Sequence, residues 1–167
     1  MVIPHPDTQN TVVNCAVITV SDTRNKENDH SGQIIQQLLN QAGHEVAIYT
    51  IIKDEPAAIQ DLLEYLEHQF SLEAIIFTGG TGIAPRDTTY DVVASWLDQT
   101  IPGFGEIFRY LSYQEIGSRA IASRAVAGVK QQKLVFSLPG SAKAVELGLN
   151  KLILPELNHL TKQVQGK

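Results

Sequence analysis

Three stretches of the chain, 15–20, 74–77 and 134–136, are apolar at almost every position and show no alternation between apolar and polar residues. Such stretches are typical of strands buried on both faces, as in a parallel sheet covered by helices. A fourth apolar stretch, 46–52, predicts a further strand beside the first.

Between these stretches, apolar residues recur at the three- and four-residue spacing of amphipathic helices. This spacing predicts helices over 33–42, 56–70, 89–98 and 142–154. Gly43, directly after the first helix, suits the left-handed conformation that ends many helices. The region 102–129 predicts one or two helices and then a short strand over 124–129, which a turn at 130–132 joins to the next strand.

Strands that alternate with helices predict an α/β fold, a three-layer α/β/α domain built on a mostly parallel sheet with right-handed crossovers. The 167 residues suffice for one domain with a sizeable core. We expect this domain to span residues 12–165. The preceding residues 1–11 are rich in proline and polar side chains, which predicts a loosely ordered tail rather than a signal peptide.

Composition and charge exclude several classes of function. The net charge of −5 and the pI of about 5.5 argue against nucleic-acid binding, which requires a basic face. No apolar stretch is long enough to span a membrane, so we expect a cytoplasmic protein without membrane association. Cys15, the only cysteine, is predicted to be a core residue, and the five scattered histidines show no zinc-ligand spacing.

Polar residues follow each predicted strand. Ligands of open α/β sheets bind beyond the carboxyl ends of the strands, where these residues converge. They comprise Ser21 and Asp22 after the first strand, Asp29, Ser31 and Gly32 at the following helix start, Lys53, Asp54 and Glu55 after the second, 78–87 after the third and 137–141 after the last.

Three of these groups have an equally good structural explanation. Asp29 or Ser31 can simply cap the first helix. Asp54, which precedes Pro56, fits a helix cap followed by proline in the first turn. Ser141 can cap the last predicted helix. For these residues the pattern leaves a structural and a functional role open.

The glycine-rich loop after the third strand favours a functional role. Gly79, Gly80 and Gly82 within four positions cost backbone entropy that a plain turn does not require. Their N–H groups can converge on an anion, helped by the dipole of the helix that begins near Thr88. No Gly-Lys-Ser/Thr follows, so the loop is not a Walker loop.

Asp87 follows this loop, beside Arg86. A carboxylate next to a phosphate cradle is repelled unless a cation intervenes, which suggests Mg²⁺, with Asp54 as a second ligand. The structural alternative for Asp87 is a cap of the next helix. The candidate basic partners of phosphate, which would offset the acidic background, are Arg86, Arg124 and Lys143.

These motifs, in this order, resemble the MoaB/MogA family of molybdenum cofactor biosynthesis proteins, whose domain also occurs in gephyrin and its plant counterpart. The resemblance covers about residues 12–160. It rests on Asp29-x-Ser31-Gly32, Thr78-Gly79-Gly80-Thr81-Gly82 with Pro85-Arg86-Asp87, Pro102-Gly103-Phe104-Gly105-Glu106, Glu115-Ile116-Gly117, Ser123-Arg124-Ala125, Leu138-Pro139-Gly140-Ser141 and Leu154-Pro155-Glu156-Leu157.

The resemblance implies a molybdopterin-binding fold and transfer of AMP from Mg·ATP to the terminal phosphate of molybdopterin, with release of pyrophosphate. It implies that Asp54 and Asp87 are the catalytic residues and the Mg²⁺ ligands. The resemblance and the positions at the strand ends together assign a set of residues to substrate and nucleotide binding. These residues are Ser21, Ser31, Gly32, Thr78, Gly79, Gly80, Thr81, Gly82, Arg86, Ser123, Arg124, Pro139, Gly140 and Ser141.

The sequence departs from the family pattern at two positions. Ala142 stands where many members have proline, and Glu55 where many have a second Asp. The retained Pro85-Arg86-Asp87 favours an active enzyme over a molybdopterin-binding or scaffold protein without catalysis. An unrelated nucleotide-binding α/β protein is the third hypothesis.

The family also implies a homo-oligomer, a trimer or a hexamer, and contacts with other proteins of the cofactor pathway. The segment 102–108 is apolar enough to lie at a subunit contact.

Overall fold

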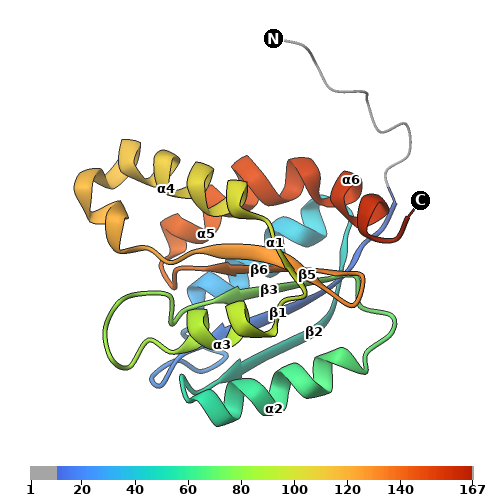
Figure 1. Cartoon of the computed structure of the whole chain (residues 1–167), viewed down its shortest axis with the longest axis horizontal. Coiled ribbons are helices and arrows are strands. Elements are labelled where there is room, and N and C mark those ends of the chain that lie inside the picture. The colour runs from blue at the N-terminus through green and yellow to red at the C-terminus, as the bar shows by residue number, and fades with distance from the viewer. Residues whose placement is uncertain (1–10, 167) are drawn as a thin grey trace.

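The computed structural model describes residues 11–166 and contains a six-stranded sheet with helices on both faces (Figure 1). The strand order is β2-β1-β3-β6-β5-β4. The first four of these strands run parallel, and the last two pair antiparallel. The strands are β1 (Asn14–Val20), β2 (Glu45–Ile52), β3 (Ala74–Thr78), β4 (Gln99–Thr100), β5 (Val126–Lys130) and β6 (Lys133–Leu138). The predicted mostly parallel α/β fold is confirmed.

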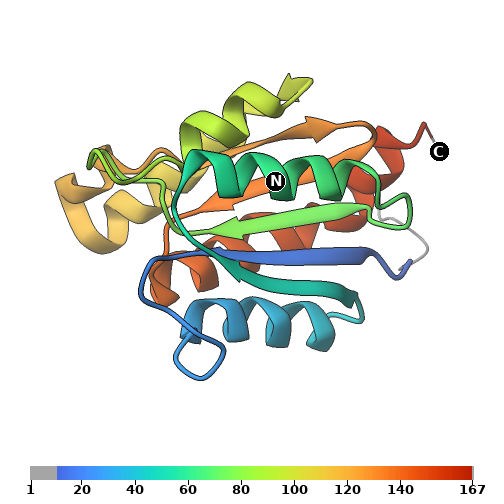
Figure 2. The same cartoon turned by 90° about the horizontal axis from the view of Figure 1, so that it is seen from below.

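The helices cover the sheet in two layers (Figures 1 and 2). Helices α1, α4, α5 and α6 pack on one face, and α2 and α3 on the other. The helices are α1 (His30–Gln41), α2 (Pro56–Glu67), α3 (Thr89–Trp96), α4 (Pro102–Ile116), α5 (Ala142–Gly148) and α6 (Leu154–Val164). A 3-10 helix, η1 (Gly117–Ala122), follows α4, and a π-helical turn, η2 (Leu149–Ile153), joins α5 to α6.

Alternate residues of the central strands supply the two cores. Val17 of β1 and Ile76 of β3 face the layer of α1, α4, α5 and α6, whereas Ile18 and Phe77 face α2 and α3. This double burial explains why the strands lack a polar face. Cys15 is fully buried among them, and burial raises the pKa of its thiol to about 12, which confirms it as a core residue.

The observed elements differ from the predicted ones mainly at their ends. Helix α1 begins three residues earlier than predicted, and α2 ends three residues sooner. Helix α6 lies beyond the last predicted helix, because Pro155 breaks the apolar pattern and occupies the first turn of a new helix instead. The two-residue strand β4 carries no pattern that sequence could reveal.

Residues 1–10, most of the predicted tail, lie outside the described residues. Thr11, the last residue of that tail, donates a hydrogen bond from its hydroxyl to the side-chain oxygen of Asn158 on α6 (3.0 Å). None of the helices between residues 11 and 166 combines the length and the apolar character that crossing a membrane requires.

His44, at the turn between α1 and β2, makes the stability of the fold sensitive to pH. The side chain is buried, and its Nδ1 accepts a hydrogen bond from the backbone N–H of Val13 (3.3 Å), which requires a neutral ring. Burial lowers the pKa of His44, although Glu73 opposes the shift. The unfolded chain therefore binds a proton near pH 6.5 before the folded one does.

We expect the free energy of unfolding to fall as the pH is lowered through about 6.5, because folding then requires the release of this proton. His44→Gln should flatten the dependence over this range. Urea unfolding of both proteins between pH 8 and pH 5.5 measures the effect. Equal pH dependence of the two would contradict the assignment.

Candidate functional site

A cleft of about 410 Å³ lies at the carboxyl ends of β3 and β6, between the loops after these strands and the wall formed by α4 and η1. Nine of the predicted site residues line it together. They are Gly79, Gly80, Thr81, Gly82, Asp87, Ser123, Pro139, Gly140 and Ser141. Residues separated by more than 60 positions in the chain thus share one cavity.

Gly79 and Gly80 make the turn out of β3 with positive φ angles of +105° and +63°. A Cβ at Gly79 would collide with the backbone carbonyl oxygen of Val20, and one at Gly80 with the side chains of Thr89 and Asp54. The Gly79 N–H donates to the carbonyl of Leu138, at the end of β6 (3.0 Å). Only glycine satisfies both the backbone angles and the space at these two positions.

Asp54 lies behind this turn and is almost fully buried. Its Oδ1 accepts hydrogen bonds from the backbone N–H (3.0 Å) and the hydroxyl (2.7 Å) of Thr88. Asp54 does not cap α2, because Glu55 occupies the cap position and makes no side-chain cap bond. The helix-cap explanation of Asp54 is therefore wrong. The carboxylate instead joins the end of β2 to the end of the glycine-rich loop.

Asp87 lines the cleft itself. Its Oδ2 accepts a hydrogen bond from the backbone N–H of Ala84 (3.1 Å), and its own N–H donates to the carbonyl of Ala84 (2.9 Å). Thr88 occupies the cap position of α3, without a side-chain cap bond. Asp87 therefore closes the tip of the loop on itself and is not a helix cap.

Arg124 joins the glycine-rich loop to the segment before β5 through hydrogen bonds. Its Nε donates to the carbonyl of Gly82 (2.9 Å), and its second terminal nitrogen to the carbonyl of Asp87 (2.9 Å). The first terminal nitrogen pairs with the carboxylate of Asp91 (2.9 Å), and the guanidinium lies over the ring of Tyr90, 4.8 Å from its centroid. These contacts hold the loop, and a phosphate contact of Arg124 stays a prediction.

Arg86 points to a different set of partners. Its Nε donates to the carboxylate of Asp22 (2.8 Å), and a terminal nitrogen lies 3.7 Å from Glu55. The hydrogen bond from Arg86 lowers the pKa of Asp22. Arg86 does not line the cleft, and its contact with a ligand stays a prediction.

The Leu-Pro-Gly-Ser turn after β6 is held by a buried network around Asp29. The carboxylate of Asp29 is fully buried and accepts bonds from Thr19 (2.5 Å), Tyr49 (2.7 Å), Arg24 (3.3 Å) and the N–H of Gly32 (3.1 Å). Burial and the hydrogen bond to Asp29 raise the pKa of the Tyr49 hydroxyl. Because Asp29 binds the Gly32 N–H, its predicted role as the cap of α1 is confirmed.

The carbonyl of Gly140 receives two further bonds, from the Arg24 guanidinium (2.7 Å) and from the Ser31 hydroxyl (2.8 Å). Ser31 therefore does not cap α1 but anchors the turn. Thr78 likewise donates its hydroxyl to the carbonyl of Pro139 (3.1 Å). Ser141 accepts from the N–H of Ala144 (3.2 Å), which confirms it as the cap of α5.

The remaining predicted residue, Ser21, lies at the end of β1 outside the cleft. Its hydroxyl accepts hydrogen bonds from the N–H groups of Thr23 (3.3 Å) and Arg24 (3.2 Å) and shapes the loop before α1. Together with Ser31, Gly32, Asp54 and Thr78, it forms a layer of polar contacts that positions the cleft without lining it.

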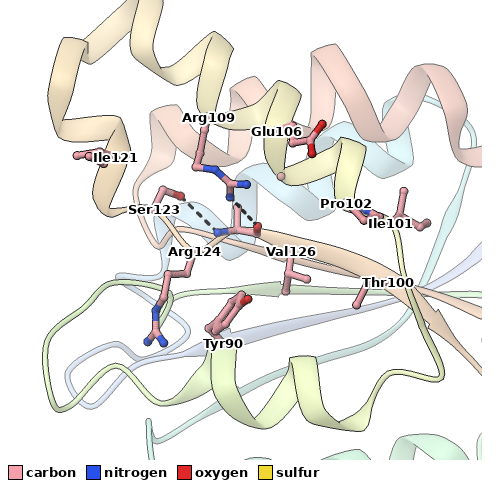
Figure 3. A pocket seen from close by; sticks show the side chains of 12 residues that line it. Tyr90, Thr100, Ile101, Pro102, Glu106, Arg109, Ile121, Ser123, Arg124 and Val126 are labelled. Atoms are coloured by element: carbon pink, nitrogen blue, oxygen red, sulfur yellow. Dashed lines mark hydrogen bonds between the residues drawn. The ribbon is translucent and has the colours of Figure 1, made fainter.

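A second cleft of about 430 Å³ shares Ser123 with the first (Figure 3). The Arg109 guanidinium points into it and donates to the carbonyl of Ala125 (3.3 Å), while Tyr90 and Arg124 lie at its edge. Neither the glycine-rich loop nor Asp87 lines this second cleft. Most of the site residues predicted from the sequence therefore line the first cleft.

The sequence-based prediction missed the wall opposite the glycine-rich loop. Phe108, Ser112 and Ile116 of α4 and Arg119 of η1 line the cleft. They fall in the region 102–129, where the pattern defined no helix boundary. The GSRA sequence around Arg119 carries no signal of its own, because only the fold brings it to the strand ends.

Comparison with known proteins assigns the class first. The family described as a probable molybdopterin binding domain matches residues 16–159. Molybdenum cofactor biosynthesis protein B of Staphylococcus aureus is 53% identical over 159 residues, which cover 93% of this chain and 94% of that protein. The chain belongs to the MoaB/MogA family of molybdenum cofactor biosynthesis proteins.

Solved structures agree with this assignment. A crystal structure of a molybdenum cofactor biosynthesis protein B superimposes with a TM-score of 0.91 at 47% identity, covering 94% of this chain and 98% of that one. The molybdopterin biosynthesis enzyme MoaB of Thermus thermophilus gives a TM-score of 0.81 at 34% identity, with 93% and 98% covered. The predicted molybdopterin-binding fold is thus confirmed.

Gly79→Ala tests whether the turn out of β3 depends on glycine. A methyl group there meets the Val20 carbonyl at a φ of +105°, so we expect the free energy of unfolding to fall by at least about 2 kcal/mol. Gly103→Ala is the matched control, because a Cβ at Gly103 meets no atom within 4 Å. The control should be neutral or slightly stabilising. Urea unfolding compares the three proteins, and equal stability of the two variants would contradict the constraint.

Proposed function

We propose that this protein binds molybdopterin in the cleft beside the glycine-rich loop and transfers AMP from Mg·ATP to the terminal phosphate of the pterin. The observation that carries the proposal is that the glycine-rich loop and Asp87 line one cavity. Backbone N–H groups of such a loop suit phosphate, whereas the carboxylate of Asp87 repels phosphate unless a cation lies between them. Membership of the MoaB/MogA family and the name of the Thermus relative, a molybdopterin biosynthesis enzyme, support it.

The residues around the loop suit a hard cation. Each of Asp54 and Asp87 uses one carboxylate oxygen for a hydrogen bond to the loop, which leaves the other oxygen available. The hydroxyl of Thr89 is fully buried beside Gly80 and has no hydrogen-bond partner within residues 11–166. Mg²⁺ prefers oxygen ligands and needs only one or two protein carboxylates. We therefore assign Mg²⁺ to Asp54 and Asp87.

When bound, Mg²⁺ would offset the charge of the triphosphate and of the leaving pyrophosphate. The chain's own residues bind and orient the phosphates of the two substrates. Loop N–H groups donate to phosphate oxygens, and the bonds from Asp54 and Arg124 keep the loop from moving away. The pterin's phosphate oxygen attacks the α-phosphorus of ATP, and the bond to the β-phosphate breaks with its electron pair on pyrophosphate. Nucleotidyl transfer of this kind needs no covalent protein nucleophile.

The outer face of α4 supports the proposal of a homo-oligomer, a trimer or a hexamer. Ile107, Tyr110, Tyr113 and Ile116 recur every three residues and are each at least half exposed. In contrast, Phe104 and Phe108 of the expected contact segment are buried against β6. A stripe of four large apolar residues is typical of an interaction site.

Asp87→Asn tests the catalytic assignment. The amide oxygen can still accept the Ala84 N–H, so the loop should keep its shape, but an amide is a poor ligand of Mg²⁺. We expect the rate of AMP transfer to fall about 100-fold or more while molybdopterin binding stays nearly intact. Pyrophosphate release from Mg·ATP and molybdopterin measures the rate.

Asp61→Asn, on the exposed side of α2, is the matched control and should keep full activity. Excess EDTA should abolish activity of the unsubstituted protein, and added Mg²⁺ should restore it. Full activity in EDTA would refute the metal assignment. Absence of pyrophosphate release despite tight molybdopterin binding would instead identify a binding protein without catalysis.

Tyr110→Glu with Tyr113→Glu tests the subunit contact. Two charges in an apolar contact cannot be buried without a large desolvation cost, so the oligomer should dissociate. Light scattering gives the mass in solution, and urea unfolding checks that the subunit stays folded. If the mass of the unsubstituted protein is that of one chain, the proposed oligomer is wrong.

A further inference from the structure

Arg119 is a basic side chain on the wall of the cleft. It lies on η1, lines the cleft opposite the glycine-rich loop and is exposed. Among residues 11–166 it has no hydrogen-bond or ion-pair partner. An arginine without a protein partner in a cleft is available to an anionic ligand.

The other four arginines are already engaged. Arg109 donates to a backbone carbonyl, Arg86 pairs with carboxylates, and Arg24 and Arg124 do both. Each of these guanidinium groups holds two parts of the chain together. Arg119 is therefore the arginine that can give its charge to a ligand without breaking a contact of the fold.

The charges of the cleft indicate which ligand group Arg119 binds. Asp87 lies on the side of the glycine-rich loop. Mg²⁺ held there would neutralise the triphosphate. The phosphate of the pterin carries no metal of its own and enters a protein with a net charge of −5. It requires a positive partner away from the loop, and Arg119 stands on the opposite wall.

We propose that Arg119 binds the terminal phosphate of the pterin substrate, an inference that rests on the proposed function. A guanidinium can donate two parallel hydrogen bonds to one phosphate and so fix its orientation. Its positive charge also favours the fully ionised phosphate, the form that attacks the α-phosphorus. Ser112 and Ser123 line the same cleft and offer further donors. Ile116, which is half exposed, provides an apolar side chain beside them.

The test compares molybdopterin with its dephosphorylated form, prepared by phosphatase treatment, in anaerobic binding titrations. Arg119→Gln should weaken binding of molybdopterin about 10- to 100-fold. It should leave the affinity for the dephosphorylated pterin and for Mg·ATP unchanged. Arg119→Lys should lose less affinity, because it keeps the charge but not the two parallel bonds.

Lys151→Gln is the matched control, because it removes the same charge from an exposed residue that lines a different cleft between α4 and η2. It should bind molybdopterin like the unsubstituted protein. An equal loss in Arg119→Gln and Lys151→Gln would mean that only the overall charge matters, and would overturn the assignment.

The failure of this inference differs from the failure of the proposed function. If the unsubstituted protein prefers molybdopterin to the dephosphorylated form and Arg119→Gln keeps that preference, only the role of Arg119 is wrong. A loss confined to Mg·ATP also overturns it, because Arg119 would then bind the nucleotide. If the unsubstituted protein binds neither ligand, the proposed function itself is wrong.

Discussion

The contact between Gly79 and the ends of β1 and β6 determines the geometry of the whole candidate site. The Gly79 N–H bonds to the last residue of β6, and its Cα faces the Val20 carbonyl with no room for a side chain. The chain must therefore leave β3 with a positive φ angle and turn over the sheet edge. The direction of the loop that follows, and hence the position of Asp87, depends on this turn.

The loop beyond this turn lacks an apolar anchor, and polar contacts from distant segments hold it instead. Asp54 binds Thr88 at one end of the loop, and Arg124 binds the carbonyls of Gly82 and Asp87. Charged groups make stronger hydrogen bonds than neutral ones, particularly where they are shielded from water. The backbone N–H groups of the loop can therefore meet an anion without the loop first having to become ordered.

The distribution of charge explains how an acidic protein could bind the phosphorylated ligands of the proposed function. Most of its arginines bind carbonyls and carboxylates of the protein itself, so these guanidinium groups are not available to a ligand in the cleft. A ligand would instead meet backbone dipoles, a cation on the two aspartates and one guanidinium. Placed charges of this kind favour a particular arrangement of phosphates, whereas a generally basic surface would favour any polyanion.

Sequence alone determined the layers, because strands buried on both faces and amphipathic helices have distinct apolar periods. It also located the glycine-rich loop and Asp87, because three glycines within four positions and a carboxylate beside them are unusual for a plain turn. It could not separate residues that line the cleft from those that support it. Ser31 and Arg124 carry side chains suited to either task, and only their hydrogen-bond partners in distant segments show which task they have.

Arg119 shows that local sequence can also miss a residue that lines the cleft. Nothing in its local sequence distinguishes it from a solvated surface residue, and a helix boundary that the pattern left undefined precedes it. Its place on the cleft wall follows from where α4 ends and how α4 packs on the sheet. Local periodicity encodes the elements of this protein. Which side chains meet at the strand ends depends on contacts between residues far apart in the chain, which only the tertiary structure brings together.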